Sequence, residues 1–151
     1  MLWPGKTRNK DIRSLQDFYL KKINQFSRCE IIETKEARGL TEKDAKRIME
    51  IEAKDIEKHL RDDYIICLHQ DGREMDSLEF ATLFEKITST LSSSISFIIG
   101  GFIGLEDSIL KKADFLLSLS KFTFSHELSR IILLEQVYRA LSIINGRQYA
   151  K

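Results

Sequence analysis

Hydrophobic residues follow two spacings along this chain, one typical of amphipathic helices and one typical of buried strands. Apolar residues recur every three or four positions over residues 11–26, which predicts a first helix. The segment Thr41–Asp44 resembles a capping box, so it predicts the start of a charge-rich helix over residues 45–60. A third helix is expected over residues 77–91, with Ser77 as its cap.

Short apolar runs lie between these helical segments and are typical of strands that are buried on both faces of a parallel sheet. Such runs occur at Tyr64–Leu68, Ile95–Ile99 and Phe115–Ser118, and Cys29–Glu33 is a further short strand candidate. A short helix around residues 106–113 separates the last two of the three long runs. The alternation of strand and helix predicts an α/β fold with a largely parallel sheet flanked by helices.

Ligands of parallel α/β sheets bind in the crevice beyond the carboxyl ends of the strands. Three segments of this chain are expected there: Leu68–Gly72, where Asp71 and Gly72 are expected to turn the chain, Gly100–Gly104 and Leu119–Glu127. These segments are therefore the first candidates for a binding site.

The last predicted helix, residues 127–145 with Gly146 as its C′ residue, carries apolar residues on more than one face. One stripe contains Leu133, Leu134, Val137 and others, whereas Ile131, Ile132 and Tyr138 project elsewhere. A helix of this kind is buried on more than one side. The second side requires either another layer of the same domain or a partner chain, and we favour a homodimer.

Length and charge limit the classes of function. The 151 residues correspond to one domain, residues 1–151, and 42% of them are hydrophobic, enough for a core of its own. Lys and Arg number 24 against 23 Asp and Glu, a net charge of +1. This balance excludes a bulk polyanion binder, so a nucleic-acid surface requires local sorting of charge.

The cysteines and the apolar segments indicate a cytoplasmic protein. Cys29 and Cys67 lie far apart without a C-x-x-C motif, which fits a reducing compartment better than a disulfide scaffold. The start of the chain has too short an apolar stretch for a signal peptide, and the apolar segment 95–105 is about half a membrane span.

The glycine-rich segment Gly100–Gly104 follows a predicted strand and precedes a helix, as phosphate-binding loops do. It lacks the G-x-G-x-x-G pattern and the acid about 20 residues further on, which excludes the Rossmann fingerprint. Gly101 and Gly104 also match the G-x-x-G of KH modules, but Phe and Ile stand where a basic residue is usual. From the residues alone, a tight turn without a ligand is an equally good interpretation.

The segment Leu119–Glu127 places hydroxyls, two aromatic residues, one Lys and one His at the carboxyl edge. It is suited to reading the edge of a heterocycle, but Ser125 as a helix cap and His126 as an exposed side chain explain it as well. No G-x-S-x-G motif surrounds Ser125, which argues against a hydrolase triad. The three histidines lack the spacing of a zinc site.

Basic residues gather at the two ends of the chain. Lys6 and Arg8 belong to a basic amino-terminal segment, and Arg139, Arg147 and Lys151 follow one another without an acid between them. Such ends suit contacts with phosphates, and Tyr149 is placed to stack on a base, although solvated tails explain them nearly as well.

Several segments occur together in one order. They are Gly-Gly-x-x-Gly-Leu at 100–105, Leu-Ser-Leu-Ser-Lys-Phe-Thr-Phe-x-His at 117–126, Arg-Ile-Ile-Leu-Leu-Glu-Gln-Val-Tyr-Arg-Ala at 130–140 and Asn-Gly-Arg-Gln-Tyr at 145–149. In this set the chain resembles the ribosomal RNA large subunit methyltransferase H family of SPOUT-class enzymes.

The resemblance implies a SPOUT fold with a trefoil knot near the carboxyl end, a rare exception to the rule that chains are not knotted. It also implies a homodimer, S-adenosylmethionine as cofactor, and methylation of N3 of a pseudouridine in 23S ribosomal RNA of the large subunit or the assembled ribosome. The cofactor positions of the family fall on Leu68, Gly100, Leu119, Ser120, Lys121, Phe122, Thr123 and Phe124.

N3 must lose a proton during the reaction, which requires a base or a cation that stabilises the anion. The candidates for this chemistry are His126 and Arg139. Arg130, Arg147, Tyr149, Lys6 and Arg8 are the candidates for contacts with the RNA.

The chain differs from the family pattern at both ends of the matching region. Ser125 replaces the usual Pro before the His, and Ala150 replaces a His in the tail. The predicted first strand retains only Met1-Leu2-Trp3. Two alternatives stay open: a SPOUT enzyme with a different RNA target, or an inactive ribosome-binding module with the same fold.

Overall fold

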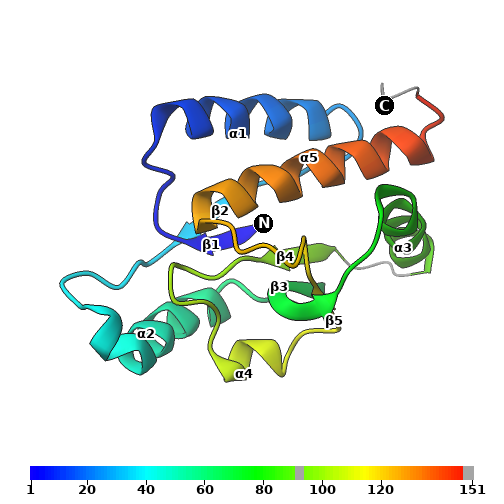
Figure 1. Cartoon of the computed structure of the whole chain (residues 1–151). Coiled ribbons are helices and arrows are strands. Elements are labelled where there is room, and N and C mark those ends of the chain that lie inside the picture. The colour runs from blue at the N-terminus through cyan, green and yellow to red at the C-terminus, as the bar shows by residue number, and fades with distance from the viewer. Residues whose placement is uncertain (91–93, 148–151) are drawn as a thin grey trace.

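A five-stranded parallel sheet forms the centre of the computed structural model, which describes residues 1–90 and 94–147 (Figure 1). Its strands lie in the order β2-β1-β4-β3-β5. Their bounds are β1 Leu2–Pro4, β2 Ile32–Thr34, β3 Tyr64–Arg73, β4 Ile95–Ile98 and β5 Phe115–Leu117. The pairings between neighbouring strands are all parallel, which confirms the α/β class expected from the sequence.

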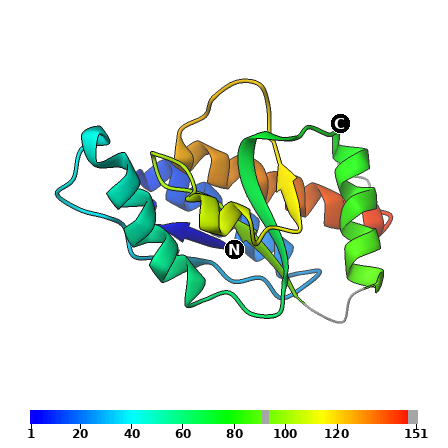
Figure 2. The same cartoon turned by 90° about the horizontal axis from the view of Figure 1, so that it is seen from below.

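Helices cover both faces of the sheet (Figures 1 and 2). On one face, α5 lies next to the sheet, α1 lies over α5, and α3 stands beside α5. On the other face lie α2, which follows a short 3₁₀ turn, and α4. The helices are α1 Lys10–Ile23, α2 Ala45–Glu57, α3 Ser77–Thr90, α4 Asp107–Leu110 and α5 His126–Ile144, and the 3₁₀ turn is Glu42–Asp44.

The two faces enclose separate hydrophobic clusters. The larger one lies under α1, α3 and α5 and includes Trp3, Ile66 and Leu134. The smaller one lies under α2 and α4 and includes Ile56, Ile98 and Ile109. Apolar burial on both faces explains the continuous apolar runs of the strands, because successive side chains of a strand point to opposite faces.

α5 finds its second apolar partner within the chain. Its Tyr138 ring lies 6.3 Å from the ring of Tyr19 on α1 and 6.0 Å from that of Phe26, while α3 packs along another side. The sheet, α1 and α3 therefore cover most apolar residues around α5, whereas Leu128 in its first turn is 42% exposed. Of the two explanations left open by the sequence, another layer of the same domain is the one observed for this helix.

β3 is longer than expected, because Asp71 and Gly72 continue the strand and do not turn the chain. The pairing of β3 with β5 shifts register between Leu68 and Arg73, which is typical of a β-bulge. A Cβ at position 72 would lie 2.7 Å from the backbone carbon of Leu117, so glycine permits this close approach. The predicted turn was wrong because Asp-Gly also suits a bulge.

Two other expected boundaries also differ. Asp76, rather than Ser77, caps α3, because its Oδ1 accepts hydrogen bonds from the backbone N of Leu78 and Glu79 at 2.9 and 2.8 Å. Ser77 instead donates a hydrogen bond to Gln136 Oε1 at 2.7 Å. The second strand begins at Ile32, three residues later than Cys29.

Several local predictions are confirmed. The capping box is formed at Thr41–Asp44, Ser125 caps α5 by accepting from the backbone N of Leu128, and Gly146 follows α5 with φ of +64°. No helix within the described residues is long and apolar enough to cross a membrane. The trefoil knot implied by the resemblance stays a prediction.

Candidate functional site

A cavity of about 820 Å³ lies at the carboxyl edge of the sheet. The end of β3, the glycine turn after β4 and the loop between β5 and α5 surround it, and Figure 2 shows this turn and this loop at the same edge. These are the three segments at which a binding site was expected. All cofactor positions implied by the resemblance line the cavity: Leu68, Gly100, Leu119, Ser120, Lys121, Phe122, Thr123 and Phe124.

The glycine turn, residues 100–104, is closed by its own backbone. The N–H of Gly104 donates to the carbonyl of Gly101 at 3.2 Å, and Gly104 has φ of +110°, which favours glycine. A Cβ at position 100 would lie 2.5 Å from the carbonyl carbon of Gly104. The glycines are thus required by a tight turn, and the same turn forms one wall of the cavity.

Hydroxyl groups shape the segment Leu119–Phe124, the cofactor loop implied by the resemblance. Ser118 Oγ donates to the carbonyl of Ser120 at 3.3 Å, and Ser120 Oγ accepts from the backbone N of Phe122 at 3.0 Å. Lys121 lies 3.7 Å from Glu74, but both side chains are well exposed, so this ion pair contributes little stability. The loop is therefore held mainly by its own backbone and hydroxyls.

His126 is the first residue of α5 and lies half-buried in the wall of the cavity. Burial lowers the pKa of its imidazole, and the guanidinium of Arg130 lowers it further. The neutral form of His126 is therefore favoured near pH 7, and a neutral imidazole accepts a proton. His126 combines two properties of a general base: a neutral ring and a position next to the cavity.

The basic amino-terminal segment is fastened beside His126. The carboxylate of Glu127 accepts hydrogen bonds from the backbone N of Arg8 at 2.5 Å and of Asn9 at 3.4 Å. The Arg8 guanidinium donates to Glu36 at 2.6 Å and is largely exposed, as is Lys6. These contacts place the segment that carries Lys6 and Arg8 next to the first turn of α5.

Arg130 is fully buried, with 0% of its surface exposed. Its guanidinium donates to the carbonyl of Pro4 at 2.7 Å and to Thr7 Oγ1 at 3.1 Å, and it lies 5.1 Å from the centre of the Trp3 ring. Burial lowers its pKa to about 10, so it stays charged at neutral pH. The expected RNA contact of Arg130 is therefore corrected: in this structure it links α5 to the first strand.

Arg139 and Arg147, two further sequence candidates, do not line the cavity. Arg139 lies 13 residues beyond His126 on α5, about 20 Å along the axis at 1.5 Å per residue, and pairs with Glu135 at 2.6 Å. It therefore does not share a site with His126 in one chain. The Arg147 guanidinium lies 4.6 Å from the centre of the Phe26 ring. Tyr149 lies outside the described residues.

Glu52 of α2 is a site neighbour that the sequence analysis missed. It is 4% exposed, its Oε1 accepts from the backbone N of Ala37 at 3.4 Å, and a Cβ at position 101 would lie 2.6 Å from its Oε2. Burial is the main cause that raises the pKa of its carboxyl. The sequence contained one signal of its burial. Glu52 lies four residues from both Ile48 and Ile56, so it falls on the buried stripe of its helix.

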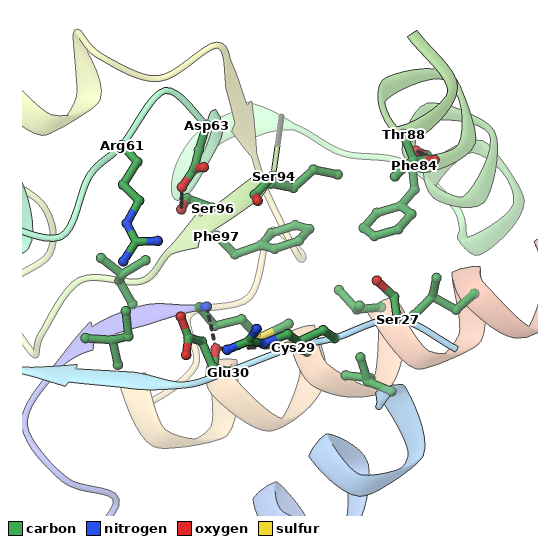
Figure 3. A pocket seen from close by; sticks show the side chains of 18 of the residues that line it. Ser27, Cys29, Glu30, Arg61, Asp63, Phe84, Thr88, Ser94, Ser96 and Phe97 are labelled. Carbon is green, nitrogen blue, oxygen red and sulfur yellow. Dashed lines mark hydrogen bonds between the residues drawn. The ribbon is translucent and has the colours of Figure 1, made fainter. Parts of the chain in front are cut away.

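A second cavity of about 560 Å³ opens at the opposite edge, where the strands begin (Figure 3). Phe84 and Phe97 stack at 6.2 Å on one side, and Ser96 Oγ donates to Asp63 Oδ2 at 2.6 Å. Burial raises the pKa of the Cys29 thiol in this wall, which disfavours the reactive thiolate. Its lining lacks a glycine turn, and its polar groups are already paired in part, so the carboxyl-edge cavity is the better candidate.

No group of three or more His, Cys, Asp or Glu side chains within residues 1–90 and 94–147 is arranged to hold a metal ion. The polar groups that line the carboxyl-edge cavity include hydroxyls, Asp71, Lys121 and His126.

Comparison with known proteins gives consistent matches. A family model described as "Predicted SPOUT methyltransferase" matches residues 1–150. A protein of Thermodesulfovibrio yellowstonii named ribosomal RNA large subunit methyltransferase H is 42% identical over 147 residues, covering 97% of this chain and 94% of its own. The protein of the same name from Acholeplasma laidlawii is 37% identical over 147 residues, with 97% and 95% covered.

A solved structure also shares the fold. A probable methylase family protein from Haemophilus influenzae superposes with a TM-score of 0.55 at 15% sequence identity, covering 99% of this chain and 69% of its own. At this identity the likeness concerns the fold alone, and it agrees with the parallel α/β architecture described above.

The raised pKa of Glu52 predicts a pH-dependent stability. The folded state holds the proton of the Glu52 carboxyl more tightly than the unfolded state does. The stability that this proton contributes is therefore fully present below the ordinary pKa of 4.5, and it is lost as the pH rises through the raised pKa of the folded state. We expect Glu52→Gln to be more stable than the wild type at pH 8, by about 1 kcal/mol, and nearly equal to it at pH 4.

Urea unfolding at both pH values measures this difference. Glu50→Gln, an exposed change on the same helix, is the matched control and should shift neither curve. An equal effect of Glu52→Gln at pH 4 and pH 8 would contradict the assignment.

Proposed function

The chain belongs to the SPOUT methyltransferase family, and we propose that it methylates ribosomal RNA of the large subunit with S-adenosylmethionine as methyl donor. One observation carries the proposal: the cofactor positions of the family, which are scattered over 57 positions of the sequence from Leu68 to Phe124, line one cavity. The proposed substrate is the pseudouridine implied by the resemblance, position 1915 of 23S ribosomal RNA, methylated at N3. With this substrate the enzyme works in the cytoplasm.

The residues of the cavity fit the cofactor. A volume of about 820 Å³ lies in the range typical of cofactor sites, and Ile99 and Leu117 provide apolar surface beside the hydroxyls of Ser120 and Thr123. When bound, S-adenosylmethionine supplies a methyl group that is already activated on a sulfonium. Backbone groups of Gly100 and of the cofactor loop would hold it, since Gly100 has no side chain that could block the approach to its backbone.

His126 is the proposed base. The N3 proton of the target base has to leave before or while N3 bonds to carbon, and the neutral imidazole at the cavity wall accepts it. Much of the remaining acceleration comes from holding the reacting atoms in line. Arg139 is not assigned to this step, because it lies about 20 Å from His126 along α5.

Local rather than global charge supports RNA binding. The net charge of +1 provides no long-range attraction. Lys6 and Arg8 are exposed in the segment that is fastened to the start of α5, and we assign them to contacts with phosphates. Arg147 and Tyr149 are retained as proposed contacts from the carboxyl-terminal end.

The proposed activity is tested with ribosomes that carry or lack the pseudouridine and that all lack its methyl group. We expect the purified protein to bind S-adenosylmethionine and to transfer labelled methyl only to ribosomes with the pseudouridine. Mapping the methyl group to another nucleotide would indicate a SPOUT enzyme with a different target. Ribosome binding without transfer would indicate an inactive module and would overturn the proposal.

The role of His126 predicts an acid limb in the pH profile. Since its pKa is lowered from 6.5, the wild-type kcat/KM should hold near pH 7 and fall only below pH 6.5, as the imidazole takes up a proton. We expect His126→Gln to lower kcat about a hundredfold or more and to lose this limb. His59→Gln, an exposed histidine of the other cavity, is the control with unchanged activity. A His126→Gln profile that keeps the limb would refute the role.

We infer that the enzyme acts as a homodimer, as the resemblance implies, and that α1 contributes to the interface. Leu15 and Phe18 on α1 are 47% and 52% exposed, and α1 is the outermost layer on its side of the molecule (Figure 1). Neighbouring exposed apolar side chains of this size are typical of surfaces that bind another protein.

The change Phe18→Glu tests this surface. Light scattering at micromolar concentration should give about twice 17.6 kDa for the wild type and about 17.6 kDa for Phe18→Glu, because a charge would be buried at the interface. Leu78→Glu, which alters an exposed apolar residue on α3, should stay dimeric. A monomeric wild type would refute the dimer, and a dimeric Phe18→Glu would exclude α1 from the interface.

A further inference from the structure

Phe102 at the tip of the glycine turn has no role in the proposed cofactor site. We propose that its ring is the platform on which the target base of the RNA stacks during methyl transfer, an inference that rests on the proposed function. The proposal concerns a substrate-positioning residue, because the ring carries no group that could exchange a proton.

Phe102 is exposed and lines the carboxyl-edge cavity. Of the three exposed phenylalanines among residues 1–90 and 94–147, Phe102 and Phe122 line the carboxyl-edge cavity, whereas Phe18 lies on α1. Phe102 is 54% exposed although it borders a cavity. A large apolar ring at this place leaves a flat surface that faces both the cavity and the solvent.

Phe102 occupies a central position of the tight turn, where a phenylalanine is unusual. The centre of a tight turn normally holds Gly, Asn, Asp, Ser or Pro, because these residues suit its backbone and the surrounding water. Here the two central residues are Phe102 and Ile103, between Gly101 and Gly104. Turn formation does not require a ring at position 102, so its presence at the mouth of the cavity is explained by a ligand.

The stiffness of the turn makes the ring a suitable platform. The hydrogen bond from Gly104 to Gly101 closes the turn, and there is no room for a side chain at position 100, against the backbone of Gly104, or at position 101, against Glu52. A ring on a fixed backbone loses little conformational freedom when it binds a partner. Phe102 is therefore preorganised by its surroundings.

A base of the RNA fits this surface better than the cofactor does. Gly100 at the foot of the turn is buried and belongs to the proposed cofactor site, whereas Phe102 lies at the tip, where a substrate arrives from solvent. Enzymes that modify a base take it out of its stack, and aromatic side chains then replace the lost neighbours. A phenylalanine ring has no polar atoms, so stacking on it leaves the hydrogen-bonding edges of the base free.

The test compares Phe102→Ala, Phe102→Leu and Phe102→Trp with the wild-type protein. Calorimetry measures the Kd for S-adenosylmethionine, methyl transfer gives kcat and KM for unmethylated ribosomes, and co-sedimentation measures ribosome binding. We expect Phe102→Ala to raise the ribosome KM about tenfold, which corresponds to the free energy lost when one base-aromatic stack is removed. The cofactor Kd should change less than about twofold. Phe102→Trp should behave as the wild type, and Phe102→Leu as Phe102→Ala, since leucine is apolar but not flat.

Two controls separate the possible explanations. Leu78→Ala removes an exposed apolar side chain that does not line the cavity and should change none of these values. Phe122→Ala, in the cofactor loop, should raise the cofactor Kd. Thermal unfolding shows whether each variant is folded.

Either of two results would overturn the platform: an unchanged ribosome KM in Phe102→Ala, or a cofactor Kd that rises as much as the KM. Failure of the proposed function is a different result, because the wild type would then bind no cofactor or transfer no methyl. In that case co-sedimentation still tests the platform. The inference is overturned if Phe102→Ala binds ribosomes as tightly as the wild type does, or if the wild type does not bind ribosomes.

Discussion

The buried guanidinium of Arg130 connects the two ends of this fold, and the geometry of the site depends on that connection. It joins the last helix to the carbonyl of Pro4 and to Thr7, residues more than 120 positions earlier in the chain. Removal of a side chain that leaves a buried hydrogen-bonding group without a partner typically costs about 1–3 kcal/mol per group, and here the Pro4 carbonyl and the Thr7 hydroxyl would lose Arg130. Arg130 thereby holds the start of α5, with His126, at the carboxyl edge of the sheet, and its charge also lowers the pKa of that histidine.

The candidate site itself follows from the parallel sheet. Parallel strands end at one edge, so segments that are distant in sequence meet there: the end of β3, the glycine turn and the cofactor loop. Two close approaches set the shape of the turn between them, since Gly100 packs on Gly104 and Gly101 packs on the carboxyl of Glu52. The buried carboxyl of α2 therefore supports the cavity wall from outside the cavity.

Much of this architecture was predictable from local sequence patterns. Helical spacing, apolar runs and the caps at Thr41, Ser125 and Gly146 depend on residues within a few positions of one another, and the structure confirms them. The location of the cavity was predictable for the same reason, because the parallel class alone implies where ligands bind. The turn expected at Asp71-Gly72 failed because the same pair suits a bulge, and only the register with β5 distinguishes the two.

The sequence by itself determined the fold class, the approximate position of the helices and strands, and the family to which the chain belongs. Only the tertiary structure decided the roles of single charged residues. Arg130 was expected at the RNA and is buried, Arg139 was expected at the reaction and lies far along α5, and Glu52 was not considered and lies against the glycine turn. The physical reason is that burial and electrostatic surroundings depend on contacts between distant segments, such as α1 over α5, which a local spacing does not contain.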